Sequence, residues 1–285
     1  MLLNTKKKPI GIVLWKGKSL LDGKRIMVIA TGVFGKTENK KTGNMIQTWI
    51  LRRDINPILA RRMGEDYSIC GNCKAREKST CYVNLGRSPF AIFNAYHDDR
   101  YKMFEDKDLD YFRGRSIRIG SYGDPSCIPY EIWENICEVA KSWTGYTHQW
   151  DNKKVDPRLK YLCMASVDSI KGYMKEYEKA QQLGWRTFRI RESLDNPLTD
   201  KEFICPASKE GGVKTTCEKC NSCNGLISGS FHKSPVIVHH ADSEAMGSMW
   251  RLERYIKMMK LIKWKKSWRR DYQTEKKKFK EVCPF

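Results

Sequence analysis

The amino-acid sequence predicts an α/β fold, a TIM-like (β/α) barrel of regular or irregular form. Two observations support this prediction. From about residue 115 the chain alternates short apolar strands with amphipathic helices, a pattern typical of parallel strands covered by helices. The 285 residues also leave room for about six to eight such units. An open doubly wound sheet is the alternative, although neither a G-x-G-x-x-G motif nor a P-loop is present.

The predicted strands follow from short apolar runs. Residues 10–53 are expected to form β-structure, because two apolar runs flank a Gly/Asp turn and "MIQTWILRR" continues with β-branched and aromatic residues. The strands expected later in the chain lie within residues 116–125, 161–169, 185–192, 201–208 and 234–242.

Two helices are predicted between these strands. Pro129 is expected to open the first, whose apolar positions follow helical spacing as far as Trp143. Asp168 or Ser169 is placed to cap the second, and Gly184 stands where a helix C-terminal glycine belongs. Helices between successive strands are the connections that a parallel sheet requires.

The net charge of +20 is the largest compositional signal. Residues 251–280 hold thirteen Lys or Arg against three acids, and such a field favours nucleic acid or an anionic membrane face. Aromatic residues interleave with the charges, which favours nucleic acid over a lysine-rich composition without function. The candidate DNA-binding residues are Lys263, Lys265, Lys266, Arg269 and Arg270. We expect residues 251–285 to form a basic, aromatic-rich helical extension. Residues 1–250 are expected to form a single catalytic domain, stapled by a metal at the cysteine motifs described below.

No signal peptide and no run of the ~18 apolar residues needed to span a membrane is evident. A soluble, intracellular protein without a membrane partner is expected. Eleven cysteines in such a protein argue for metal binding or buried thiols rather than disulfides. The isolated Cys137, Cys163 and Cys283 are predicted to be structural.

The loop "CPASKEGGVKTTCEKCNSCNG" is the clearest metal-binding motif. Its cysteines, Cys205, Cys217, Cys220 and Cys223, have the spacing C-x11-C-x2-C-x2-C, and short C-x2-C steps aim thiolates at one ion. Zinc is the predicted metal, and an iron–sulfur cluster is the alternative. A nearby histidine could replace Cys205 as a ligand. The candidate replacements are His232, His239 and His240.

A second cluster, Cys70, Cys73 and Cys81, occurs in "CGNCKAREKSTC". Its C-x2-C-x7-C spacing departs from the C-x3-C-x2-C pattern of radical-SAM enzymes. With no local fourth cysteine, the sequence predicts either a distant ligand, such as Cys127, or an iron site with an open position. A loop with buried thiols is the non-functional alternative.

Three aspartates are candidate catalytic residues because each follows an apolar strand. Asp124, Asp168 and Asp242 would lie at the carboxyl edge of a parallel sheet, where substrates bind in such folds. A carboxylate there can attack an anomeric carbon or move a proton on a base. The structural alternative is that Asp124 forms a turn and Asp168 caps a helix.

The candidate substrate-binding residues lie in or beside the same strands. "GSYGDP" contains more glycine than a simple turn requires, and "WTGYTHQW" supplies rings that can stack on an extruded base. "WRTFRIRE" places arginines among apolar residues, where they need anionic partners, either phosphates or the chain's own acids. The candidates are Ser121, Tyr122, Gly123, His148, Trp150 and Arg189.

Six segments between about residues 65 and 240 carry a family resemblance: "CGNC…CYVNLGRSP", "RIGSYGDPSCIP", "TGYTHQW", "MASVDS", "GWRTFRIRE" and "CPASKEGG…CEKCNSCNG". Together they resemble the phage-encoded DNA 7-deazaguanine transglycosylases, relatives of tRNA-guanine transglycosylase. The chain lacks the D-S-G-G-F-Q motif of the tRNA enzyme, and its zinc motif differs from the C-x-C-x2-C with a later His found there.

The resemblance implies an enzyme of the infected bacterial cytoplasm that exchanges guanine in DNA for a preQ0-like deazaguanine. It implies a zinc site at residues 205–223 and roles for Asp124 and for Asp168 or Asp242 as nucleophile and proton-transfer group. Its partners would be DNA, most simply duplex, and the small deazaguanine. Two other functions stay open: an iron–sulfur enzyme acting on nucleic acid through the 70–81 cluster, and a non-catalytic, zinc-stabilised DNA-binding protein.

Overall fold

The computed structural model describes residues 8–77, 81–167, 173–191, 198–225 and 234–238. The chain divides into two compact units, Met1–His240 and Ala241–Phe285, and every described residue belongs to the first. The expected basic extension and its candidate DNA-binding residues therefore lie outside the described residues. These are Lys263, Lys265, Lys266, Arg269 and Arg270.

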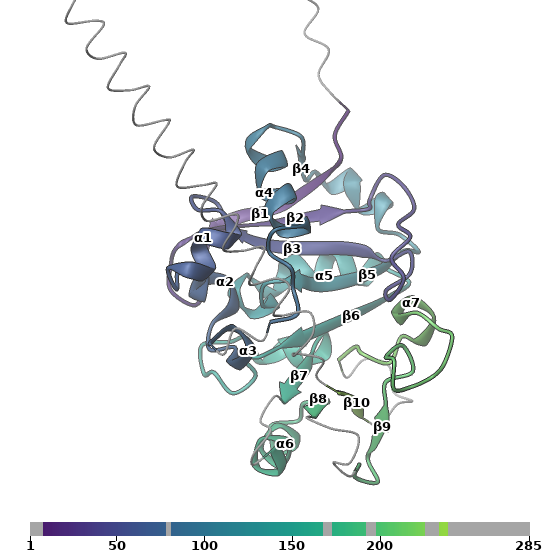
Figure 1. Cartoon of the computed structure of the whole chain (residues 1–285). Helices are drawn as coiled ribbons and strands as arrows, with labels where there is room; N and C mark the ends of the chain where they lie inside the picture. Colours follow the sequence, from purple (N-terminus) through teal and green to yellow (C-terminus); the bar gives the residue numbers. More distant parts are fainter. Residues whose placement is uncertain (1–7, 78–80, 168–172, 192–197, 226–233, 239–285) are drawn as a thin grey trace, which may run out of the picture. The chain divides into compact units, whose positions relative to one another are not determined.

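A single mixed sheet organises the described part of the chain (Figure 1). Its strands are β1 (Gly11–Lys18), β2 (Arg25–Thr31), β3 (Ile46–Arg52), β4 (Lys102–Met103), β5 (Ser116–Tyr122), β6 (Ser142–Thr147), β7 (Met164–Val167), β8 (Thr187–Arg191), β9 (Glu202–Ile204) and β10 (Ser234–Val238). They are ordered β4-β1-β2-β3-β5-β6-β7-β8-β10-β9. The predicted α/β class is confirmed. In the described ranges the sheet is open, with β4 and β9 at its ends, so closure into a barrel is not observed.

The predicted N-terminal β-structure is an antiparallel meander that belongs to the same sheet. β1 pairs with β2 and β2 with β3, and the register of β1 shifts between Val13 and Trp15. Nearly all of β2 is buried, which explains its continuous apolar sequence. From β3 onward each neighbouring pair in the sheet order is parallel. The sheet thus joins the antiparallel β1–β3 meander to a parallel half at β3, and at the far end the short β4 pairs in parallel with β1.

Short helices connect and cover the strands. They are α1 (Pro57–Arg62), α2 (Tyr67–Cys70), α3 (Lys74–Glu77), α4 (Ser88–His97), α5 (Tyr130–Val139), α6 (Tyr173–Gln182) and α7 (Cys217–Cys220), with 3-10 helices η1 (Asp106–Tyr111), η2 (Pro125–Cys127) and η3 (Pro157–Tyr161). After α6, Gly184 adopts the left-handed conformation predicted for a helix C-terminus, with φ +77°.

The helix predicted after Pro129 is α5, but its predicted length is wrong. Pro129 is the N-cap residue, and Trp133 on the buried face is fully enclosed by the core. The helix ends at Val139 because Ala140 takes an extended conformation, with ψ 151°. Trp143 belongs instead to β6, where it pairs with Ile117 of β5 and its indole donates to the Leu162 carbonyl. Sheet pairing outweighs the helical spacing of the apolar residues here.

The predicted structural role of two isolated cysteines is borne out. Cys137 and Cys163 are buried in the hydrophobic core, and burial raises the pKa of both thiols. Such thiols stay protonated and act as small apolar side chains. Cys283 lies outside the described residues.

The pKa of a tyrosine predicts how stability changes at alkaline pH. Burial raises the pKa of Tyr101 from 10.0 to about 12. A folded-state pKa above the unfolded value favours folding below pH 10, and this contribution is lost as the pH rises toward about 12. We therefore expect Tyr101→Phe to make the decline in unfolding free energy between pH 10 and 12 less steep, measured by denaturant titration. The matched control is Tyr161→Phe, at an exposed ring. A slope unaltered by Tyr101→Phe would contradict the assignment.

Candidate functional site

The loops that follow β3, β5 and β6 meet at the carboxyl edge of the parallel strands. The backbone N–H of Asp124, after β5, donates to the Ile69 carbonyl at 2.6 Å. The Gln149 side chain, after β6, donates to the Cys70 carbonyl at 3.3 Å. Carboxyl ends of adjacent parallel strands are where α/β proteins place their ligands. This edge is therefore the first candidate site.

Asp124 is the central hydrogen-bond acceptor of this edge. Its Oδ1 accepts from the Ser126 backbone N–H (3.0 Å) and from Thr147 Oγ1 (2.8 Å). Its Oδ2 accepts from the His148 backbone N–H at 2.7 Å. The carboxylate is 3% exposed and caps η2 while tying the end of β5 to the end of β6. The turn and cap interpretation accounts for the Ser126 contact. The contacts with Thr147 and His148 go beyond it and place His148 at the edge.

Packing explains why the second glycine of "GSYGDP" is needed. Gly123 has φ +85°, and a Cβ there would lie 2.7 Å from Ile50 Cβ. Only glycine allows this conformation and this close approach of the β5 loop to β3. The extra glycine thus brings Asp124 against the Ile69 backbone, which a larger residue would push away.

Cys70, Cys73 and Cys81 come together at the same edge. Burial raises the pKa of Cys70, and the nearby Asp66, Cys81 and Cys73 raise it further. Burial also raises the pKa of Cys81; Cys73 acts in the same direction, whereas Arg61 and His148 oppose it. The cluster therefore adjoins the His148 side of the site. The proposed distant ligand Cys127 is engaged elsewhere, since its thiol donates to the Asp124 carbonyl at 2.9 Å.

An unsatisfied hydroxyl lies beside these thiols. Tyr122 is 4% exposed, and in the described residues its Oη has no hydrogen-bond partner. Burial raises its pKa, and the neighbouring Cys70, Asp66 and Cys81 add to the increase. Buried hydroxyls normally have a partner. The cluster together with Tyr122 consequently offers donors that an additional bound group could satisfy.

Cys70 ends α2 and Cys73 directly precedes α3, and these helices are held by a buried ionic network. Asp66 is 1% exposed and accepts from Arg76 Nε at 2.7 Å, with Arg61 at 3.5 Å on its other oxygen. These contacts join α1, α2 and α3 through side chains rather than through the sheet. This network therefore holds Cys70 and Cys73 in place.

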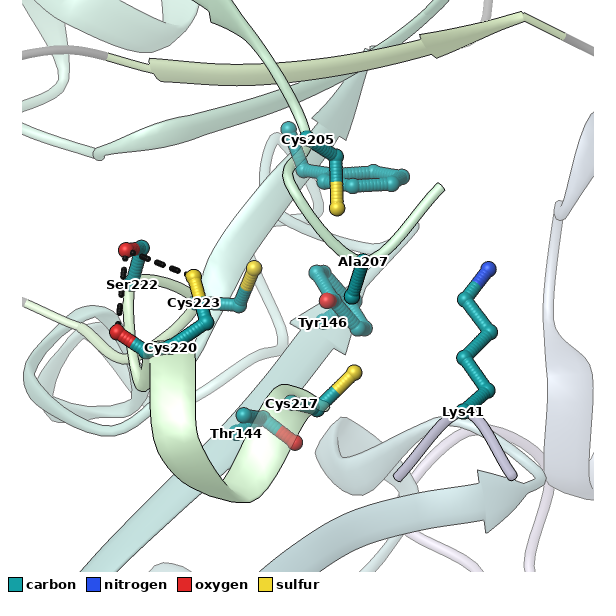
Figure 2. A pocket seen from close by; sticks show the side chains of 10 residues that line it. Lys41, Thr144, Tyr146, Cys205, Ala207, Cys217, Cys220, Ser222 and Cys223 are labelled. Atoms are coloured by element: carbon teal, nitrogen blue, oxygen red, sulfur yellow. Dashed lines mark hydrogen bonds between the residues drawn. The ribbon is translucent and has the colours of Figure 1, made fainter. Parts of the chain in front are cut away.

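The second cysteine loop forms a small cavity of its own (Figure 2). Figure 2 shows the four thiols grouped around the ring of Tyr146, which packs on Phe188 with centroids 4.6 Å apart. The cavity volume is about 30 Å³, room for an ion or a water molecule but not for a nucleobase. The residues lining it are Lys41, Thr144, Tyr146, Phe188, Cys205, Ala207, Cys217, Cys220, Ser222 and Cys223.

Hydrogen bonds attach this loop near one end of β3, and the first cysteine cluster lies near the other end. The Cys217 N–H donates to the Lys41 carbonyl (2.9 Å), and Glu218 Oε2 accepts from the Asn44 N–H (2.8 Å). Lys41 and Asn44 precede β3, so the loop lies toward the amino end of that strand. On β6, the Gly145 N–H donates to the Cys223 carbonyl at 3.0 Å. The loop thus connects the β2–β3 turn to β6, in the parallel half of the sheet.

The four cysteine thiols of this loop are metal ligands of the kind that zinc prefers. Burial raises the pKa of Cys205 and Cys217, and raises that of Cys223 to about 12. Arg118 and Lys41 act in the opposite direction on Cys217, favouring its thiolate. Four thiols are the ligand set of structural zinc sites. Within the described ranges, however, no three His, Cys, Asp or Glu side chains are spaced so as to hold an ion.

The remaining candidate substrate-binding residues make internal contacts. Ser121 donates to Gln47 Oε1 at 2.8 Å, and the indole of buried Trp150 donates to the Ser166 carbonyl at 3.0 Å. Arg189 forms a buried bidentate pair with Glu202. The anionic partner that the sequence required for Arg189 is therefore an acid of the chain itself.

Several candidates cannot be placed. Asp168, Asp242, His232, His239 and His240 lie outside the described residues. Their assignment as catalytic residues or alternative ligands stays a prediction.

The structure also brings in residues that the sequence analysis did not select. Arg118 and Tyr82 form a hydrogen bond with each other between the two cysteine clusters. Lys41 lines the second cavity, and the Thr147 hydroxyl donates to Asp124. Arg118 could have been found from the argument applied to "WRTFRIRE", because "SIRIG" also places an arginine within an apolar strand. The other three carry no local signal, since their roles depend on residues far apart in the chain.

Comparison with known proteins adds no relative: no family model, curated protein or solved structure matches the chain. None of the helices in the described ranges combines the length and apolar character needed to cross a membrane.

Proposed function

We propose that the chain is a nucleic-acid-modifying enzyme that exchanges a guanine in DNA for a 7-deazaguanine base. One observation supports this most directly. Asp124 and His148 follow the adjacent parallel strands β5 and β6, and Asp168 comes directly after Val167, the last residue of β7. Two carboxylates and a histidine after three adjacent parallel strands supply the kinds of group that glycosidic chemistry requires, at the edge where such sheets bind substrates.

The proposal gives the aspartates distinct roles. Both Asp124 oxygens already accept hydrogen bonds, so Asp124 serves as a positioning residue for His148. Asp168 is the proposed nucleophile: its carboxylate attacks C1′, and the C1′–N9 bond breaks as guanine leaves and takes up a proton. The incoming deazaguanine then attacks C1′ after giving up its own proton, with Asp242 as the proton-transfer group. The carboxylate is released as the new glycosidic bond forms.

The rest of the molecule takes supporting roles in this proposal. The parallel strands would form part of an irregular TIM-like barrel, and the 205–223 loop would hold zinc as a structural staple. Cys205, Cys217, Cys220 and Cys223 would be its ligands, and zinc would supply folding energy rather than chemistry. The basic residues 251–285 would bind duplex DNA in the cytoplasm of an infected bacterium.

Nucleoside mass spectrometry tests the reaction. DNA from bacteria that express the chain with a deazaguanine supply is expected to contain the modified deoxynucleoside. Asp168→Asn should lower its amount at least about 100-fold, because an amide is a poor nucleophile. The matched control, Asp156→Asn, changes an aspartate that caps η3 and pairs with the exposed Arg158, and it should keep the product level. An unmodified DNA in the presence of folded wild-type protein would refute base exchange.

A second function is favoured by a specific observation. Cys70, Cys73 and Cys81 act on one another's thiols and lie beside Tyr122, whose Oη has no hydrogen-bond partner in the described residues. The three thiols are not spaced to hold an ion in the described structure, but they are the ligand set of an iron–sulfur cluster with three thiolates and one open iron. Metal analysis of anaerobically purified protein separates the two proposals. Iron and labile sulfide that are lost in Cys73→Ser but kept in the core variant Cys163→Ser would favour an iron–sulfur enzyme over base exchange.

A further inference from the structure

Arg118 stands in the middle of β5 on the sheet face between the two cysteine clusters. Its Nη2 donates to Tyr82 Oη at 2.7 Å, and Tyr82 follows Cys81 directly. Its other electrostatic neighbours are Tyr146 and Cys217, which line the second cavity. The guanidinium thus connects the carboxyl edge with the 205–223 loop.

Arg118 is half-buried, yet it forms no ion pair with a carboxylate in the part of the chain described. The fully buried Arg52 and Arg189 pair with acids, and the half-buried Arg115 and Arg186 each donate to several backbone carbonyls. Among the described residues Arg118 has the Tyr82 hydroxyl as its one side-chain hydrogen-bond partner. A guanidinium carries five N–H donors and is always charged. Taking it partly out of water without an anion is unfavourable. The position is therefore suited to an anion that comes from outside the chain.

The present partner of Arg118 is easily displaced. Tyr82 is 71% exposed, so moving its ring would sacrifice little buried surface. A neutral phenol is also a weaker acceptor than a phosphate, which takes two parallel N–H bonds from one guanidinium. A second cation is nearby: Lys41 acts together with Arg118 on the Cys217 thiol and lines the second cavity (Figure 2).

We propose that Arg118 binds a phosphate group of the nucleic-acid substrate, in place of Tyr82, on the face between the two cysteine clusters. The substrate class is taken from the proposed function, and the subsite specifies which part of the substrate it holds. A phosphate on β5 places the attached nucleoside along the strand that ends at Tyr122 and leads to Asp124. The cysteine loop then forms one wall of the substrate channel.

Equilibrium binding of deoxyguanosine 5′-monophosphate and of deoxyguanosine to the full chain tests the subsite. Wild-type protein should bind the phosphorylated probe more tightly. Arg118→Gln should weaken binding of that probe by about 10- to 100-fold and leave deoxyguanosine binding unchanged. Arg113→Gln, at an exposed arginine, is the matched control and should change neither. Arg118→Lys, which keeps the charge but loses the bidentate fork, should give an intermediate loss.

Zinc content and thermal unfolding of each variant are measured in parallel. If Arg118→Gln loses zinc but keeps its affinity for the phosphorylated probe, Arg118 serves the cysteine loop and the proposal is wrong. Equal binding of the two probes by wild-type protein would also overturn it. Binding does not require base exchange, so an intact phosphate effect with unmodified DNA would remove the proposed reaction and leave the subsite in place.

Discussion

Replacing Glu202 with Gln is expected to lower the free energy of unfolding by about 3–5 kcal/mol. Arg189 Nε and Nη2 donate to the two Glu202 oxygens at 2.6 and 2.8 Å, and both side chains are nearly inaccessible to water. Glu202 also accepts from the Thr199 N–H at 3.0 Å. The glutamine removes the negative charge that Glu202 supplies to the buried guanidinium and turns an amide N–H₂ toward a donor. Denaturant titration followed by circular dichroism measures the loss.

The exposed pair Arg113–Asp110 is the control for this prediction. Its atoms lie 3.4 Å apart, with 65% and 77% of the side chains exposed. Asp110→Asn should change stability by less than about 0.5 kcal/mol. The double variant Arg189→Met/Glu202→Leu should recover part of the loss, because both buried charges of the pair are then absent. A cost for Glu202→Gln as small as that of the surface variant would show that the buried pair is not needed.

The pair has a topological role that explains the size of the effect. Arg189 lies on β8 and Glu202 on β9, and β10 pairs with both strands between them. The ion pair therefore reaches across β10 and attaches the edge strand β9, which begins the segment that leads to Cys205. Its loss should loosen the cysteine loop as well as the sheet edge.

Asp124→Ala is expected to cost about 3–5 kcal/mol of unfolding free energy. The substitution removes the acceptor of the Ser126 and His148 N–H groups and of the Thr147 hydroxyl, all in a site that is closed to water. Each unsatisfied buried donor costs about 1–3 kcal/mol. Thermal or denaturant unfolding of the purified variant measures the effect.

Asp156→Ala is the matched control, because Asp156 caps η3 through the Arg158 N–H at 2.9 Å but does so at the surface. It should cost only about 1 kcal/mol, as is usual for a cap. Equal losses for the two variants would mean that the bonds of Asp124 to β6 contribute nothing. The comparison also serves as a control for the functional test. Loss of the modified nucleoside in an Asp124 variant is informative only if that variant and the wild-type protein are folded to the same extent.

Local patterns were sufficient for most of the elements. The short segments ending at Tyr122, Val167 and Arg191 are strands, as their β-branched, aromatic and other apolar residues predicted. Trp143 shows where this reasoning fails. Its spacing fits both a helix and a strand, and pairing with β5, which lies outside any local window, decides between them.

By itself, the sequence determined the α/β class, the alternation of strands and helices, and the residue types that can bind metal. These properties depend on backbone propensity, burial periodicity and ligand chemistry, which a short window contains. Only the tertiary structure decided that β3 joins the antiparallel and parallel halves, that Asp124 is held by Thr147 and His148, and that Arg118 lies between the two cysteine clusters. Each of these depends on which distant segments become neighbours, and that choice is made by the packing of the whole core.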